Sequence, residues 1–177
     1  DQWAAKTREL IQNHPVDLDE LVSVVMTSWN SIFESSIGSG FKIGTHIFPR
    51  PQVLGFLIHE LVPLEFERLS QGLWRRDSQV GEKDLVYSQD ESKSIEIKTS
   101  SSPNQIFGNR SFGQQGESQS KKVKTGYYLA INFERWDDAT GLPLVRLIRF
   151  GWLDHSDWNS QTKSNGQQAS LAPFVEN

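Results

Sequence analysis

The sequence predicts a mixed α/β or α+β fold, with helices in the first half of the chain and strands in the second. In the first half, apolar residues recur every three or four positions, which is typical of amphipathic helices. After Gly72 the pattern changes to short runs that alternate in polarity or are almost wholly apolar, as strands are. A chain of 177 residues can bury a substantial core, so we expect one domain over residues 1–177.

Two helices are predicted at the beginning of the chain. The first covers residues 3–13 and ends ahead of Pro15. The second begins at Leu18, because Asp17 is a good N-cap whose side chain can accept a hydrogen bond from the first turn. Gly38 is predicted to stop this helix, since glycine is common just beyond helix ends.

A third helix is predicted over residues 51–69. Pro51 suits the first position of a helix, where a backbone N–H is not needed. Pro63 also lies inside this range, and its missing N–H predicts a kink or a change of segment there.

Four strands are predicted in the second half, over residues 84–87, 94–99, 127–133 and 144–152. The last two are near-continuously apolar, as strands buried on both faces are. The remaining tail is polar and rich in Gln and Ser, and Trp158, Leu171 and Phe174 are its available anchors.

Composition narrows the class of protein. Hydrophobic residues make up 36% and aromatic residues 11% of the chain, which indicates a globular protein. The absence of cysteine excludes disulfides, thiolate catalysis and cysteine-bound zinc. No run approaches the roughly 20 apolar residues needed to span a bilayer, and no signal peptide is visible. We therefore expect a cytoplasmic protein.

Charge is unevenly distributed. The net charge of −4 argues against a general nucleic-acid binder. Residues 99–124, however, contain four basic residues and one acidic residue, a net charge of +3. An acidic protein with one basic segment suits a local contact with a polyanion, although an ordinary solvated surface has the same composition.

One group of charged residues indicates a chemistry. Glu96 and Lys98 share one face of the second predicted strand, because strand side chains alternate. Asp84 begins the strand before it and can reach the same place if the two strands pair through a turn at 88–93. Two carboxylates can hold a hard divalent cation such as Mg²⁺. A lysine stabilises the negative charge that a phosphodiester gains during hydrolysis.

The bare pattern of these residues is weak evidence. An aspartate followed at some distance by Asp/Glu-x-Lys is expected about once by chance in a chain of this length. Asp77 and the Glu-Ser-Lys run at 91–93 also match it, but they lack adjoining strand-like residues. Only Asp84 and Glu96 have that context. The alternative is an exposed hairpin in which Glu96 and Lys98 form a surface ion pair.

Longer runs resemble known nucleases: HELVP at 59–63, IEIKTS at 95–100, NQIFGNRSFGQ at 104–114, KKVKTGYYLAINFE at 121–134 and RFGWLDHSDW at 149–158. The two acids Asp84 and Glu96, together with Lys98, resemble the motif of the PD-(D/E)xK superfamily. The other runs are similar to type II restriction endonucleases, most nearly those of the ScaI type. The resemblance covers about residues 51–170. Lys83 departs from the motif, which has proline there, at a position that varies within the superfamily.

The resemblance implies a restriction-endonuclease-like fold of class α/β, a mixed β-sheet of about five strands flanked by helices. It implies that Asp84 and Glu96 bind Mg²⁺, with the Ile97 carbonyl as a third ligand. Lys98 is then the catalytic lysine. A type II restriction endonuclease hydrolyses double-stranded DNA at a specific sequence, so DNA is the implied substrate.

Glu60 resembles an extra acid that many members of the superfamily carry on the preceding helix. It lies at the edge of the apolar stripe of that helix, from which it can point toward a metal. Glu65 lies closer to the stripe and competes for this role. An ordinary, partly exposed glutamate is the bland alternative for Glu60.

The polar segment after the catalytic strand is the expected DNA interface, since Asn, Gln and Arg can bond base edges. The candidates are Asn104, Gln105, Asn109, Arg110, Gln114 and Gln115 for bases or backbone, and Lys121, Lys122 and Lys124 for phosphates. For any one of them, a solvated loop side chain is the alternative.

The remaining expectations concern the histidines, the binding partners and the alternative functions. The four histidines show no metal-binding spacing, so we expect them to be structural or exposed. The resemblance implies a homodimer, which symmetry also favours, because a palindromic site calls for a two-fold protein. The resemblance also implies a cognate methyltransferase, which is not a physical partner. The alternatives are a repair or junction-resolving nuclease and a catalytically inactive DNA-binding module.

Overall fold

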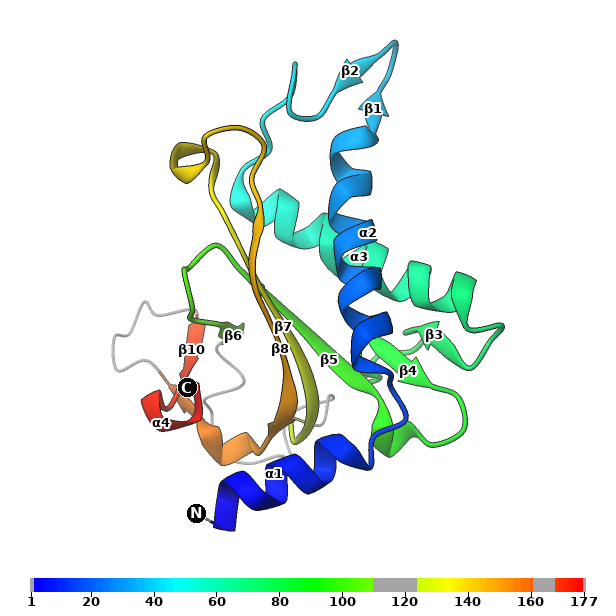
Figure 1. Ribbon diagram of the computed structural model, residues 1–177, viewed down its shortest axis with the longest axis vertical. Helices are drawn as coiled ribbons and strands as arrows, with labels where there is room; N and C mark the ends of the chain where they lie inside the picture. The colour runs from blue at the N-terminus through cyan, green and yellow to red at the C-terminus, as the bar shows by residue number, and fades with distance from the viewer. Residues whose placement is uncertain (1, 110–123, 161–167, 177) are drawn as a thin grey trace.

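The computed structural model describes residues 2–109, 124–160 and 168–176 (Figure 1). The helices in these ranges are α1 (Gln2–Gln12), α2 (Leu18–Glu34), α3 (Pro51–Leu69) and α4 (Pro173–Glu176). The strands are β1 (Ser36–Ile37), β2 (Phe41–Lys42), β3 (Trp74–Arg76), β4 (Leu85–Tyr87), β5 (Ile95–Ser100), β6 (Phe107–Asn109), β7 (Gly126–Phe133), β8 (Val145–Leu153), β9 (Trp158–Ser160) and β10 (Gln168–Leu171). The three long helices precede most of the strands, as predicted.

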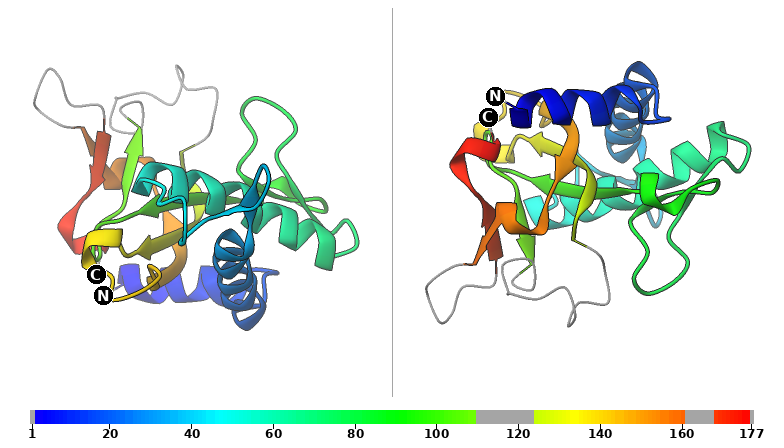
Figure 2. Two further views of the ribbon diagram at one scale, coloured as in Figure 1. Left: turned by 90° about the horizontal axis from the view of Figure 1, so that it is seen from above. Right: turned by 90° about the horizontal axis from the view of Figure 1, so that it is seen from below.

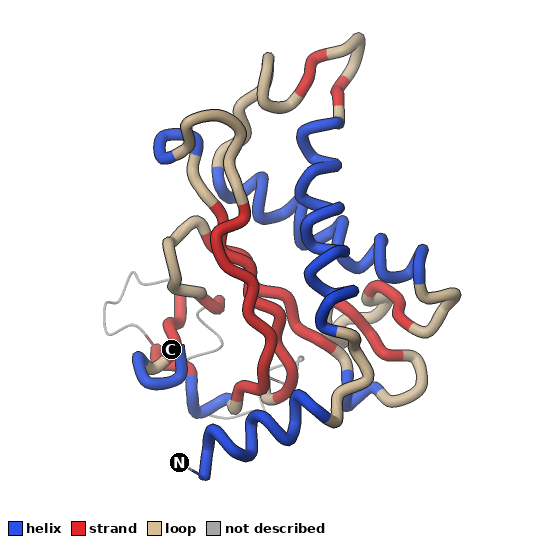
Figure 3. Tube along the Cα trace, in the orientation of Figure 1, coloured by secondary structure: helices blue, strands red, loops and turns tan. Residues whose placement is uncertain are grey.

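A mixed sheet of five strands in the order β3-β4-β5-β7-β8 lies at the centre (Figure 3). β5 and β7 are parallel, whereas the other neighbouring pairs are antiparallel. α2 and α3 pack against this sheet through the larger of two hydrophobic cores. The predicted α/β class, with a mixed sheet of about five strands flanked by helices, is confirmed.

All eight residues of β7 are buried. Its side chains alternate, so the two faces of the strand enter different cores. Tyr127, Leu129 and Ile131 belong to the larger core, whereas Tyr128 and Ala130 belong to a smaller core with β9 and β10. The predicted burial of both faces is confirmed for this strand.

Asp17 caps α2 as predicted, because its side chain accepts a hydrogen bond from the Glu20 N–H at 2.8 Å. The apolar side of α2 is buried, and Trp29 donates its indole N–H to the Pro143 carbonyl at 2.9 Å. The prediction that Gly38 stops the helix is wrong. α2 has already ended there, and Gly38 lies between β1 and β2 with φ at +61°.

α3 begins at Pro51 and continues through Pro63, so the predicted change of segment at Pro63 is wrong. Packing of the buried helix outweighs the one missing backbone donor. Gly55 permits a close approach to the sheet, because a Cβ there would lie 2.8 Å from Thr99 Oγ1 on β5. This approach places the middle of α3 beside the strand that carries the acid and the lysine.

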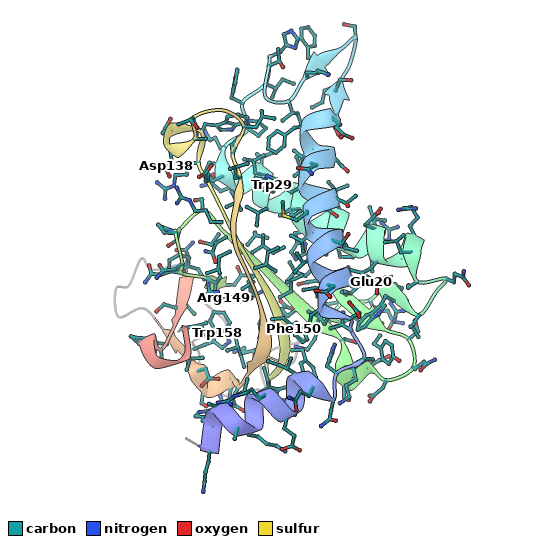
Figure 4. All side chains as sticks on the ribbon, viewed as in Figure 1. Glu20, Trp29, Asp138, Arg149, Phe150 and Trp158 are labelled. Carbon is teal, nitrogen blue, oxygen red and sulfur yellow. The ribbon has the colours of Figure 1, made fainter. Side chains whose placement is uncertain are left out.

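β8 differs from its prediction. Residues 144–152 were expected to be buried on both faces, but most of β8 is half-buried or exposed, because it is an edge strand of the sheet. Figure 4 shows Arg149 and Phe150 on opposite sides of the strand. Phe150 packs against the rings of His14 and Tyr127, with centroid distances of 4.9 and 5.8 Å.

A second sheet in the order β6-β10-β9 was not predicted. Its strands are short and come from polar segments, so their pattern does not distinguish them from loops. Trp158 and Leu171 are buried, which confirms them as anchors, and Ile106 and Ala169 join them in the smaller core. The side chain of Phe174, the third predicted anchor, lies outside the described residues.

The two sides of the molecule differ. Figure 2 shows the β3–β4 connection and the β6-β10-β9 sheet projecting on one side, away from α1 and α2. Tyr128 and Ala130, which pack with that second sheet, pair in register with Glu96 and Lys98. The acid and the lysine of β5 therefore face the projecting side. None of the helices in the described ranges combines the length and the apolar character that a membrane span requires.

Candidate active site

Asp84 lies where β4 and β5 separate. The two strands pair at Leu85 and Ile95. Next to this pair, Asp84 Oδ2 accepts a hydrogen bond from the Ile97 N–H at 2.7 Å. The aspartate side chain is only 7% exposed, and a charged acceptor makes such a bond strong. The structure thus holds the Asp84 carboxylate at the backbone amide of Ile97. This residue lies between Glu96 and Lys98, the predicted acid and lysine of β5.

Glu96 and Lys98 extend from the same face of β5. Lys98 Nζ donates to Glu96 Oε1 at 2.6 Å, and the two side chains are 13% and 4% exposed, respectively. Asp84 and Glu96 are both buried. The alternative of an exposed hairpin with a surface ion pair is therefore wrong, because this pair lies largely inside the protein. Asp77 and Glu91, which also match the sequence pattern, are exposed.

Tyr128 on β7 lies beside Glu96, with which it pairs in register. Its hydroxyl donates to the Lys124 carbonyl, and Lys83 Nζ lies 5.1 Å from the centre of its ring. Burial, and then the negative charge of Glu96, raise the pKa of the Tyr128 hydroxyl, so it remains a neutral donor. Lys83, which replaces the proline of the superfamily motif, thus packs over an aromatic ring on the same face as Glu96.

His59 contacts the site, although it was expected to be structural or exposed. Its Nε2 lies 3.2 Å from Asp84 Oδ2. The hydrogen bond to Asp84 raises the pKa of His59, against the opposing effect of burial. The sequence feature that could have identified His59 as a site residue is its position beside Glu60, on the helix that precedes the predicted catalytic strands. His14 is structural, as expected, because it is buried, its Nε2 contacts the Lys93 carbonyl at 2.8 Å and its Nδ1 accepts from the Val16 N–H at 3.2 Å. Burial lowers its pKa to about 4.

We expect His59 to titrate above 6.5, its ordinary pKa, in the metal-free protein. Its contact with Asp84 contributes stability below pH 6.5, which is lost as the pH rises through the raised pKa. In an Asp84→Asn variant the anionic partner is gone and burial favours the neutral ring, so the pKa of His59 should fall. An NMR titration of the ring proton measures both values. Equal values in the two proteins would refute the contact.

Glu60 and His59 line one surface pocket of about 280 Å³, to which Asp84 also contributes. Glu60 Oε1 lies 3.9 Å from His59 Nδ1, and the glutamate side chain is 50% exposed. Glu65 is instead paired with Arg68 on the same helix at 2.5 Å. The geometry favours Glu60 over its competitor, and its catalytic role stays a prediction.

Glu82 orders the loop that precedes Asp84. Arg75 donates two hydrogen bonds to its carboxylate, at 3.0 and 2.5 Å. The N–H groups of Ser78 and Gln79 donate to Glu82 Oε2 at 2.7 and 3.1 Å. These hydrogen bonds lower the pKa of Glu82 to about 2, and the bond from Arg75 has the largest effect. Sequence reasoning missed this pair, because Arg75 lies on β3 and Glu82 lies in the loop seven residues further along.

The lowered pKa of Glu82 predicts a pH-dependent stability. The ionised group stabilises the fold fully above pH 4.5, its ordinary pKa, and this contribution disappears as the pH falls through about 2. Glu82→Gln should lower the melting temperature at pH 7, and the difference from the wild type should shrink from pH 4.5 to pH 2. Calorimetry across this range tests it, with Glu9→Gln in the exposed pair with Lys6 as control. Equal melting temperatures at pH 7 would contradict it.

The oxygen donors at this site fit a divalent cation. Asp84 and Glu96 reach the same segment of β5, and Ile97, whose carbonyl is the predicted third ligand, lies between Glu96 and Lys98. Hard cations such as Mg²⁺ prefer carboxylate and carbonyl oxygens. In the described part of the chain, no group of three or more His, Cys, Asp or Glu side chains is arranged to hold a metal.

The predicted DNA-contacting residues have different surroundings. Asn104, Gln105 and Asn109 are exposed, as a base contact requires. Lys124 is only 2% exposed, so the prediction of a surface lysine that meets phosphate is wrong for this structure. It lies next to the buried strand β7, which draws it into the interior. Five further candidates lie outside the described residues: Arg110, Gln114, Gln115, Lys121 and Lys122.

The acids of the GWLDHSDW run have a structural role. Asp154 accepts a hydrogen bond from the Ser156 N–H at 3.0 Å, and Asp157 accepts one from the Asp154 N–H at 2.7 Å. This reciprocal arrangement caps the 3-10 turn His155–Asp157 between β8 and β9. The two acids of this run thus shape the turn that connects β8 of the central sheet with β9 of the second sheet.

The fold and this site define a class of protein. A mixed sheet of five strands that carries two buried acids and a lysine close together is consistent with a restriction-endonuclease-like nuclease. The protein-family model of the ScaI restriction endonuclease matches residues 1–177. The chain belongs to the ScaI restriction endonuclease family of type II restriction endonucleases.

A curated relative gives the extent of this similarity. The type II restriction enzyme ScaI of Streptomyces caespitosus is 54% identical over 178 residues, which include 100% of this chain and 78% of the relative. No solved structure matches the chain. The matched region therefore includes both sheets.

Proposed function

We propose that this type II restriction endonuclease hydrolyses phosphodiester bonds of double-stranded DNA at the site formed by Asp84, Glu96 and Lys98. One nuclease domain over residues 1–177 is part of this proposal. The hydrogen bond from the Ile97 N–H to Asp84 supports it most directly, because it holds one carboxylate at the strand segment that carries the other two groups. Family membership supports the reaction, and this geometry supports the choice of residues.

Lys98 is the proposed catalytic lysine. Its ammonium group is held by Glu96 Oε1 at 2.6 Å and is largely shielded from water. A positive charge in such surroundings acts more strongly than one in bulk water. It can stabilise the charge that develops on the scissile phosphate, and its other protons can orient the attacking water.

Asp84, Glu96 and the Ile97 carbonyl are the proposed ligands of a divalent cation, with Mg²⁺ as the proposed cofactor. When bound, such a cation polarises the phosphate and promotes ionisation of water. The protein holds Asp84 in place through two contacts to its Oδ2 atom, one from the Ile97 N–H and one from His59 Nε2. Glu60, in the same pocket as His59, is proposed as a further acid of the site.

The polar segment after β5 is the proposed DNA interface. Asn104, Gln105 and Asn109 offer exposed amides, which can bond adenine through two hydrogen bonds. Further contacts are proposed from Arg110 and Gln114 to bases and from Lys121 and Lys122 to phosphates. The lysine contacts would make binding weaker as the salt concentration rises.

A homodimer on a palindromic site is proposed from symmetry, and sedimentation velocity with and without DNA tests it. A mass that stays that of one chain on DNA would refute it. A cognate methyltransferase and a cytoplasmic location stay predictions.

A plasmid of mixed sequence tests the proposed reaction. Discrete fragments that require Mg²⁺ are expected, since cleavage at one sequence yields defined lengths. Cleavage without discrete bands would instead indicate a repair or junction-resolving nuclease that recognises DNA structure. Binding without any cleavage, over many sequences, would indicate an inactive DNA-binding module.

A further inference from the structure

Asn132 on β7 is a polar residue in the interior, with 0% of its surface exposed. Its side-chain amide donates hydrogen bonds to the backbone carbonyls of Ser102 at 2.9 Å and Gln105 at 3.0 Å. The amide has two donor hydrogens, and both serve these carbonyls. β7 therefore holds the loop after β5 at two points.

Arg149 on β8 holds the same loop at a third point. Its Nη2 donates to Asn132 Oδ1 at 2.9 Å and to the Asn104 carbonyl at 2.5 Å. The planar guanidinium group gives these bonds a fixed direction. Two strands of the central sheet thus bind three carbonyl groups between residues 102 and 105.

The anchored loop continues directly from the catalytic strand, which ends at Ser100. The Ser102 N–H donates to Ser100 Oγ at 3.1 Å, and the Gln105 N–H donates to Ser102 Oγ at 3.2 Å. Ile106, at the other end of the loop, is buried in the smaller core. The exposed side chains of Asn104 and Gln105 therefore project from a backbone that is held by these hydrogen bonds and by the buried Ile106.

We infer that Asn132 and Arg149 are positioning residues that determine sequence discrimination, because they fix the loop at 101–106 relative to Lys98. This inference rests on the proposed function, in which Asn104 and Gln105 contact bases. A fixed donor or acceptor bonds the correct base and leaves a wrong base unpaired, whereas a mobile one adapts to either.

Asn132→Asp is the sharpest test of this anchor. Aspartate has nearly the same size and can still accept from Arg149, but as a carboxylate it cannot donate to the two carbonyls. Ile131→Val is the matched control, because Ile131 is the preceding residue, is equally buried and points into the opposite core. Amide hydrogen exchange should become at least tenfold faster at 101–106 in Asn132→Asp, and should be unchanged there in the control.

The second readout compares two kinds of DNA substrate: the sequence that the wild-type enzyme cuts, and sequences that differ from it by one base pair. The measured quantity is the ratio of kcat/KM on the first to kcat/KM on the second. We expect this ratio to fall at least tenfold in Asn132→Asp and in Arg149→Met, and to be kept in Ile131→Val. On the wild-type site, KM should change more than kcat, because Lys98 is retained. A merely structural role would lower the melting temperature and the active fraction without changing the ratio.

Each negative result has its own meaning. Unchanged loop exchange in Asn132→Asp would overturn the anchoring, and faster exchange with an unchanged ratio would overturn its role in discrimination. A wild-type protein that cuts no DNA would overturn the proposed function, and the role in discrimination with it. The exchange measurement would still establish or refute the anchor in that case.

Discussion

Replacing Lys98 with alanine is expected to reduce kcat on the order of 10³-fold, about 4 kcal/mol of transition-state stabilisation. The ammonium group sits within the protein at 2.6 Å from Glu96 Oε1, where water cannot substitute for its charge. DNA binding in Ca²⁺ should change by less than about threefold, because the lost interaction acts in the transition state. Single-turnover cleavage and fluorescence anisotropy measure the two quantities separately.

Lys6→Ala is the matched control for this variant. Lys6 also pairs with a glutamate, Glu9 at 3.0 Å, but on the exposed surface of α1. The control should keep wild-type kcat, since exposed ion pairs contribute little. Thermal unfolding of both variants shows whether either change harms the fold. A folded Lys98→Ala protein with more than a tenth of wild-type kcat would exclude Lys98 as the catalytic lysine.

Asp84→Asn is expected to cost at least about 10³-fold in kcat and to weaken Mg²⁺ binding at least about tenfold. Asparagine keeps the shape of the side chain, and its carbonyl oxygen can still accept from the Ile97 N–H. The negative charge and with it the charged contact to His59 are lost, whereas the contact with the Ile97 N–H can be kept, so the result separates the role of the charge from that of the backbone contact. Isothermal titration with Mg²⁺ and cleavage at saturating Mg²⁺ provide the two measurements.

Asp90→Asn provides the corresponding control on the same hairpin. Asp90 accepts hydrogen bonds from the Ser92 N–H and hydroxyl, and it is exposed. Asparagine also caps turns well, so both activity and Mg²⁺ affinity should stay close to the wild type. Unchanged Mg²⁺ affinity in Asp84→Asn would remove Asp84 from the proposed ligands, whatever the effect on cleavage.

Local features of this protein could be predicted from its sequence. The N-cap at Asp17, the helix that begins at Pro51 and the buried strand β7 all follow from patterns that a few neighbouring residues complete. The shared face of Glu96 and Lys98 follows from strand alternation alone. Such features were predictable because propensity and periodicity act within one or two turns of the chain.

Errors arose where burial or neighbouring strands override a local pattern. Pro63 stays inside α3, because the packed helix tolerates one missing hydrogen bond. β8 is apolar in sequence yet half-exposed, because it lies at the edge of the sheet. Lys124 is buried despite its charge, and the β6-β10-β9 sheet forms from segments too polar and too short to be recognised.

The sequence by itself determined the class of fold, the family and the identity of the candidate acid, acid and lysine. Only the tertiary structure decided which distant groups complete the site. His59 reaches Asp84 from α3, Arg75 binds Glu82 from β3, and Asn132 binds the loop after β5. These contacts depend on how closely α3, β3 and β7 approach β4 and β5. That approach is set by the packing of whole elements, which no short stretch of sequence encodes.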